Sequence, residues 1–64
     1  MKVTYDTKAD VLRIILNTTP IEGSDEREPG VIFDYDKNGK VVGIEILDAS
    51  LRTDDPRTME FAVA

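Results

Sequence analysis

The sequence predicts a mainly β fold: a small antiparallel sheet of four strands made from two hairpins, with a short C-terminal helix or an extra edge strand. Three observations predict this fold. Apolar and polar residues alternate in short segments, an Asn-Gly pair lies between two such segments, and the length of 64 residues suits one small domain. We expect a single domain, 1–64, with a core of residues 2–51 and a tail of residues 52–64.

The first hairpin is predicted from the N-terminal third of the chain. Val3 and Tyr5 alternate with polar residues, as in a half-buried strand, and residues 7–10 form a polar turn. The next run, VLRIIL, would also give one apolar helical face, but its shortness and β-branched residues favour a strand. The apolar residues that we expect on the inner face of this hairpin are Val3, Tyr5, Leu12, Ile14 and Leu16.

Residues 17–30 separate the two hairpins. Their sequence, NTTPIEGSDEREPG, is rich in proline, glycine, serine and carboxylates. This composition predicts a loop or an irregular, exposed edge segment.

The second hairpin is predicted to turn at Asn38-Gly39, between VIFDYD and VVGIEIL. A loop of two or four residues sets Val31 opposite Ile46, Phe33 opposite Ile44 and Tyr35 opposite Val42, which keeps one face apolar. A three-residue loop would break that face. We prefer the four-residue loop 37–40, because the two-residue loop would place two lysines opposite each other. Gly43, inside the returning strand, indicates a bulge or the close approach of another group.

The two hairpins also resemble each other. YDTKADVLRII aligns with YDKNGKVVGIE, which matches Tyr5 with Tyr35 and Asp6 with Asp36. If this echo is structural, the hairpins have similar shapes and together form a four-stranded sheet with one apolar side.

Composition excludes several classes of function. The chain has no cysteine and no histidine, so disulfides, zinc sites of thiolate or imidazole ligands, and Ser-His-Asp or Cys-His catalysis are excluded within one chain. The net charge is −5, with only 8 Lys and Arg, so we expect no direct nucleic-acid binding. An acidic balance suits a basic protein partner. Without a secretion signal or a long apolar run, we expect a soluble, cytoplasmic protein that does not enter membranes.

Residues 34–45 follow the spacing of an EF-hand calcium loop, with Asp34, Asp36 and Glu45 as the candidate metal ligands. An entering helix would have to pass through Glu28-Pro29-Gly30, which a helix does not tolerate well. In a hairpin, Glu45 would lie about 13 Å along the strand from the partner of Asp36, too far for a shared ion. We therefore predict a hairpin turn, with no metal and no other cofactor.

Other polar residues have a functional and a structural interpretation. Asp34, Glu45 and Asp48 share the outer face, where carboxylates work as a general acid and base or hold magnesium through water. A solvated sheet face is the favoured alternative. Ser50 is interpreted as a turn or helix-cap residue rather than a nucleophile. No catalytic residue is predicted.

The segments YDTKADVLRIIL and EPGVIFDYDKNGKVVGIEILDAS resemble a family of short prokaryotic proteins, domain of unknown function 2283. The resemblance covers about residues 2–51 and is most specific over residues 30–50; Tyr5, Asp6, Asp10 and Leu12 match its first hairpin. It implies a compact, mostly β fold and brings no activity and no catalytic residues. Some members are encoded beside small toxin-like proteins, which implies an antitoxin-like role for them.

A single sheet with one apolar face needs a second layer. Within the chain only Leu51 and the tail residues Met59, Phe61 and Val63 are candidates, with the tail forming either a helix over 58–62 or an edge strand over 59–63. These side chains are too few, so we expect a homo-oligomer, most simply a two-fold dimer. The candidate partner or interface residues are Val31, Phe33, Tyr35, Val42, Ile44, Ile46, Asp48 and Phe61.

The preferred function is a non-catalytic protein-interaction module, with an antitoxin-like role toward a basic, toxin-like partner. The alternative is a carboxylate or magnesium-dependent enzyme. Its site would use Asp34, Glu45 and Asp48 at an interface between two chains, where a cleft can form.

Overall fold

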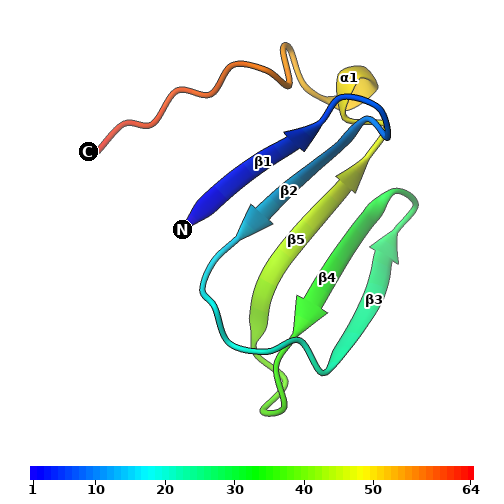
Figure 1. Ribbon diagram of the computed structural model, residues 1–64, viewed down its shortest axis with the longest axis vertical. Coiled ribbons are helices and arrows are strands. Elements are labelled where there is room, and N and C mark those ends of the chain that lie inside the picture. The colour runs from blue at the N-terminus through cyan, green and yellow to red at the C-terminus, as the bar shows by residue number, and fades with distance from the viewer.

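One antiparallel sheet of five strands, in the order β1-β2-β5-β4-β3, makes up most of the computed structural model, which describes residues 1–64 (Figure 1). The elements are β1 (Lys2–Asp6), β2 (Val11–Ile15), β3 (Gly23–Glu28), β4 (Val31–Tyr35), β5 (Val41–Leu47) and α1 (Ala49–Arg52). Residues 16–22 carry the chain from β2 past the ends of β5 and β4 to β3 (Figure 1). None of the helical structure is long and apolar enough to cross a bilayer.

The predicted mainly β fold is confirmed, but the sheet has five strands rather than four. The additional strand is β3, in the segment expected to be a loop or an irregular edge. Its sequence, GSDERE, has no apolar residue, and all of its residues are exposed. It is held by antiparallel pairing to β4, with a register shift between Glu26 and Glu28. An edge strand of this kind is stabilised by its backbone hydrogen bonds, so apolar alternation does not reveal it.

The first hairpin has the predicted register. Val3 pairs with Ile14 and Tyr5 with Leu12. The side chain of Asp6 closes the turn, because its Oδ1 accepts hydrogen bonds from the backbone N–H groups of Lys8 and Ala9, both at 3.0 Å. Leu16, expected on the inner face, lies beyond the end of β2 and is 40% exposed.

The second hairpin has the predicted apolar pairs, Val31 with Ile46 and Phe33 with Ile44. The predicted four-residue loop and the pairing of Tyr35 with Val42 are wrong. Tyr35 pairs with Val41.

Tyr35 pairs with Val41 because the loop is shorter than predicted and a bulge follows it. The N–H of Asp36 donates to the carbonyl of Lys40 at 2.9 Å, so three residues form the connection. Gly39 has φ 78°, the left-handed conformation that such a loop requires. The register shift between Asp34 and Tyr35 then leaves Val42 as the extra residue and restores the apolar pairs farther along.

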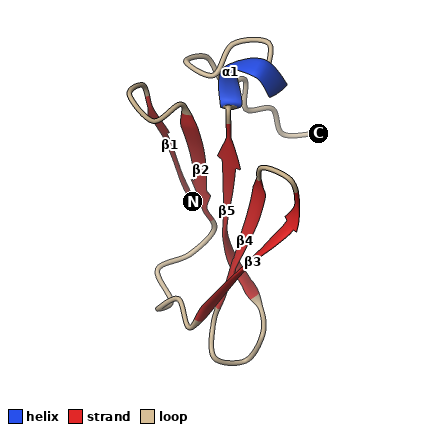
Figure 2. Cartoon of the chain, turned by 90° about the vertical axis from the view of Figure 1, so that its right-hand side faces the viewer, coloured by secondary structure: helices blue, strands red, loops and turns tan.

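The strands form a single twisted layer with α1 at one end (Figure 2). One side, which we call the apolar face, carries Val3, Tyr5, Leu12, Ile14, Val31, Phe33, Ile44 and Ile46. All of these side chains are only half-buried. Only 4 of 64 residues are buried, among them Val42, Ala49 and Asp34. The sheet therefore lacks the fully enclosed core of a two-layer domain.

The C-terminal part begins with α1, a short helix that starts directly after Asp48. The tail beyond it contains neither the helix over 58–62 nor the edge strand over 59–63 that were the two alternatives. Met59, Phe61 and Val63 are 62%, 69% and 86% exposed. A helix of five residues needs extensive packing to be stable, and the high exposure of these side chains shows that they lack it.

Candidate functional site

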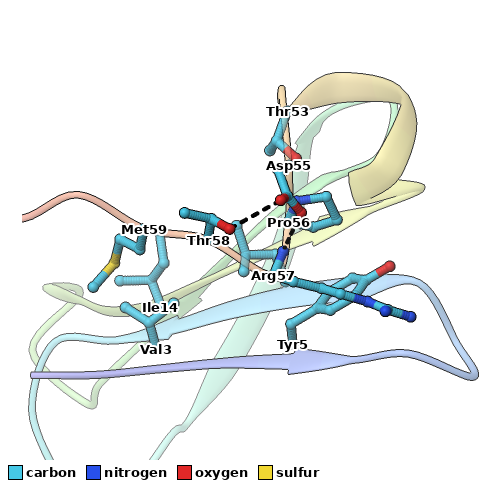
Figure 3. Close-up of a pocket in the computed structure, with 10 residues that line it drawn as sticks. Val3, Tyr5, Ile14, Thr53, Asp55, Pro56, Arg57, Thr58 and Met59 are labelled. Carbon is cyan, nitrogen blue, oxygen red and sulfur yellow. Dashed lines mark hydrogen bonds between the residues drawn. The ribbon is translucent and has the colours of Figure 1, made fainter.

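A cavity of about 390 Å³ lies between the tail and the part of the apolar face formed by β1 and β2 (Figure 3). Its floor is formed by Val3, Tyr5, Leu12 and Ile14, and its cover by tail residues between Thr53 and Met59. Figure 3 shows Met59 beside Val3 and Ile14, and Arg57 extended alongside Tyr5. The cavity is therefore apolar on the sheet side and polar on the tail side.

The tail over this cavity is held mainly by contacts within itself. Asp55 accepts hydrogen bonds from the backbone N–H of Arg57 at 3.0 Å and from the hydroxyl of Thr58 at 2.9 Å (Figure 3). The bonds from Arg57 and Thr58 lower the pKa of Asp55. The backbone N–H and the hydroxyl of Thr53 both donate hydrogen bonds to the carbonyl of Ala49, in α1. These bonds fold the tail locally and leave its contact with the sheet to side-chain packing.

The part of the apolar face on β4 and β5 lies outside this cavity. The rings of Phe33 and Tyr35 lie 6.5 Å apart. Arg27, on β3, reaches over them: its guanidinium carbon is 5.8 Å from the Phe33 ring centre, and its Nη1 donates to the Tyr35 hydroxyl at 3.1 Å. One arginine covers part of two rings, and the apolar side chains of β5 beside them stay half-buried.

The predicted interface residues fall into two groups. Val31, Phe33, Ile44 and Ile46 share the apolar face, and the ring of Tyr35 lies beside that of Phe33. Val42 is 2% exposed at the bulge, Asp48 is exposed at the start of α1, and Phe61 is exposed in the tail. The structure thus brings the first five residues together and leaves Val42, Asp48 and Phe61 apart from them. The role of all eight at an interface stays a prediction.

A second feature lies on the opposite side of the sheet. We call Arg13, Ser24, Asp34 and Glu45 the carboxyl cluster. Asp34 was expected on a solvated face, but it is only 1% exposed. The Ser24 hydroxyl donates to its Oδ1 at 2.6 Å, and its Oδ2 lies over Gly43, 3.1 Å from the position that a Cβ there would occupy. The missing side chain of Gly43 gives Asp34 the space in which it is buried, which explains the glycine noted in this strand.

Glu45 is the second carboxyl group of the cluster, next to Asp34 on the neighbouring strand. Burial, the hydrogen bond with Asp34 and the charge of Asp34 raise the pKa of Glu45, while Arg13 opposes this shift. Arg13 is the cross-strand partner of Glu45, and its Nε is buried without a hydrogen-bond partner. The cluster is therefore a desolvated group of acids with one neighbouring cation.

The three candidate metal ligands do not meet at one point, because Asp36 lies apart from Asp34 and Glu45. Asp36 lies in the hairpin turn, where its Oδ1 accepts hydrogen bonds from the N–H groups of Asn38 at 2.8 Å and Lys40 at 3.0 Å. No group of three or more carboxylates is close enough together to hold a metal ion. Residues 34–45 are a hairpin, as predicted, rather than a calcium loop.

Of the three carboxylates considered for an enzyme, only Asp34 and Glu45 come together. Asp48 is exposed beyond the end of β5. The unpartnered Oδ2 of Asp34 is itself buried, so a substrate cannot reach it. The pair has the proximity of an acid and a base but not the access that catalysis needs.

Sequence reasoning missed a third feature, the role of Asp10. Its Oδ1 accepts hydrogen bonds from the Tyr5 hydroxyl at 2.7 Å and the Ser50 N–H at 2.9 Å, and its Oδ2 accepts from the Ser50 hydroxyl at 2.6 Å. The bonds from Ser50 and Tyr5 lower the pKa of Asp10. The bond between Tyr5 and Asp10 also raises the pKa of Tyr5. Asp10 therefore ties the first turn to α1, and Ser50 is a structural donor, in line with its interpretation as a turn residue.

The contacts of Asp10, Asp34 and Ser50 all lie within one stretch of sequence that a family model matches. The model is described as "Protein of unknown function (DUF2283)" and matches residues 2–50. The chain belongs to the DUF2283 family. Neither curated proteins nor solved structures gave a significant match. The family match contains all five strands and the carboxyl cluster and ends at Ser50, so the tail over the cavity lies outside it.

Proposed function

We propose that this DUF2283 protein is a non-catalytic protein-interaction module whose apolar face is completed by a second copy of the chain. The surface area carries this proposal. The chain exposes 4945 Å², whereas a compact monomer of 7.1 kDa exposes about 4,100 Å². The excess, about 850 Å², comes from the half-buried apolar face together with the exposed tail; each partner in a standard interface buries roughly 800 Å².

The shape of the chain supports the same proposal. Its radius of gyration is 12.3 Å, compared with about 10.7 Å for a compact domain of this length. The part of the apolar face on β4 and β5 has no second layer except Arg27. A second sheet packed face to face over it would supply the missing layer, because two sheets with one apolar face each form a closed core.

Variants on opposite faces of β4 test this proposal. Phe33→Lys places a charge on the apolar face, and the matched control Ile32→Lys places the same charge on the other face, next to Glu45. We expect sedimentation velocity to show a dimer for the unmodified chain and for Ile32→Lys, and a monomer for Phe33→Lys. Val31→Thr, which keeps the side-chain shape and adds a hydroxyl, gives a milder test if Phe33→Lys loses its β-sheet circular dichroism. A Val31→Thr variant as dimeric as the unmodified chain would contradict the proposal.

The acidic surface supports a second part of the proposal, a basic protein partner. The net charge is −5, and the exposed strand β3 carries Asp25, Glu26 and Glu28. Such a surface attracts a basic protein, and the attraction weakens as salt screens it. Co-expression with the product of the adjacent gene tests this part: we expect co-purification in low salt that is lost in high salt. A complex insensitive to salt, or none in low salt, would argue against an acidic docking surface.

A further inference from the structure

We propose that Asp34 and Glu45 hold one proton between them and that this proton acts as a pH-dependent latch on the edge strand β3. The latch lies on the face opposite the proposed dimer surface. It therefore does not depend on the proposed function.

The hydrogen bonding of Asp34 indicates that a proton is shared with Glu45. Oδ1 is satisfied by the Ser24 hydroxyl. Oδ2 is buried and has no hydrogen-bond partner, and Glu45 lies diagonally across from Asp34, two residues beyond the Gly43 that pairs with it. Two ionised carboxylates cannot donate to each other, so these two groups can share a hydrogen bond only when one of them carries a proton.

The charges around the pair favour keeping that proton. From β2, Arg13 faces Glu45 across the strands, and its positive charge acts to lower the pKa of Glu45. From β3, the neutral Ser24 contacts Asp34, with Glu22 and Glu26 two residues away on either side. Burial and the neighbouring Asp34 raise the pKa of Glu45 by more than Arg13 lowers it, so the net shift is upward.

The remaining neighbours add no further cation. From β4, Asp36 lies two residues from Asp34, and its Oδ1 is bound within the hairpin turn. From β5, the residue opposite Asp34 is Gly43. The connection over residues 17–21 lies beside Gly43 and Arg13 and carries no titratable side chain. Glu26 on β3 is also engaged, because its Oε2 accepts a hydrogen bond from the Gly30 N–H at 2.9 Å.

Loss of the proton acts on β3 because Asp34 holds that strand. All residues of β3 are exposed, and Ser24 ties it by side chain to the buried Asp34. With both carboxylates ionised, a second negative charge lies beside a buried one, which is costly unless one of them reaches water. Asp34 gains water only by moving out from between Ser24 and Gly43, and this movement loosens β3.

Two measurements on the full chain test the latch. Carboxyl carbon NMR should show Asp34 and Glu45 responding in the same titration step. Amide exchange should show the protection factors in β3 falling by up to about tenfold per pH unit between the ordinary pKa of a glutamate and the raised folded-state pKa of Glu45, and levelling off above it, while those in β1 stay constant. Glu45→Gln, which supplies a permanent donor to Asp34, should remove the pH dependence in β3. Asp25→Asn, on an exposed β3 residue, is the control and should retain it.

Two results would overturn the latch. One is that Asp34 and Glu45 titrate independently of each other. The other is that β3 protection depends on pH in the same way in the unmodified chain and in Glu45→Gln. A monomeric chain at all concentrations would contradict the proposed dimer without affecting either measurement, so the two proposals fail separately.

Discussion

Oδ2 of Asp34 lies 3.1 Å from the point that a Cβ of Gly43 would occupy. Gly43 is buried and its backbone is extended in β5, so the glycine is needed for space and not for an unusual φ. A buried carboxyl group and the glycine opposite it are therefore one structural unit.

Gly43→Ala should destabilise the chain, because the added methyl group must displace a buried carboxyl group that is held by Ser24. We expect a loss of about 1–3 kcal/mol in the free energy of unfolding, measured by urea denaturation. Gly23→Ala is the matched control, since nothing lies within 4 Å of the added Cβ there; it should change the stability by less than about 0.5 kcal/mol. Equal stabilities for the two variants would show that Asp34 does not occupy the space over Gly43.

Ser50→Ala should raise the pKa of Asp10 toward its ordinary value, because the Ser50 hydroxyl is the largest cause of its lowering. A carboxyl group with a lowered folded-state pKa contributes stability above its unfolded-state pKa, and this contribution is lost as the pH falls through the folded-state pKa. The acid-unfolding midpoint of Ser50→Ala should therefore lie at a higher pH. An NMR titration that finds Asp10 unchanged in the variant would rule out this contact.

Glu45 should give the opposite pH dependence. Its pKa is raised in the folded state, so its contribution is fully present below the unfolded-state pKa and is lost as the pH rises through the folded-state pKa. Stability followed from mildly acidic to neutral pH should fall in the unmodified chain and stay level in Glu45→Gln. A decline of the same size in both proteins would assign it to another group.

Asp36→Ala should destabilise the second hairpin by about 1 kcal/mol, because two backbone N–H groups lose their acceptor. Asp6→Ala removes the matching bonds of the first turn and should have an effect of similar size. Calcium should not change the unfolding transition of the unmodified chain. Stabilisation by calcium that disappears in Asp36→Ala would restore the metal-site interpretation of the EF-hand spacing.

The sequence predicts the apolar half of this structure well. Alternation identifies the strands β1 and β4, and the short β-branched run VLRIIL predicts β2. The Asn-Gly turn predicts that β5 returns beside β4, and the need for one apolar face pairs Phe33 with Ile44 correctly. The echo between the hairpins is also real in chemical terms, since Asp6 and Asp36 each accept backbone N–H bonds in their turns. These features depend on residues that are near one another in the chain.

The polar half depends on contacts between distant residues, which alternation does not report. Strand β3 has no apolar residue, so nothing in its sequence separates it from a loop. Ser24 lies ten positions from Asp34 and Ser50 forty from Asp10, and neither spacing belongs to a common motif. The four-residue loop follows from the sequence only if the ladder of paired residues is unbroken, whereas the bulge at Val42 compensates for a three-residue loop.

Sedimentation equilibrium of the unmodified chain, over micromolar to millimolar concentrations, tests the central claim that a second copy completes the apolar face. The account predicts a mass that approaches twice 7.1 kDa as the concentration rises, with Phe33→Lys remaining at the mass of one chain. A mass of one chain at every concentration, with the β-sheet signal intact, would contradict it.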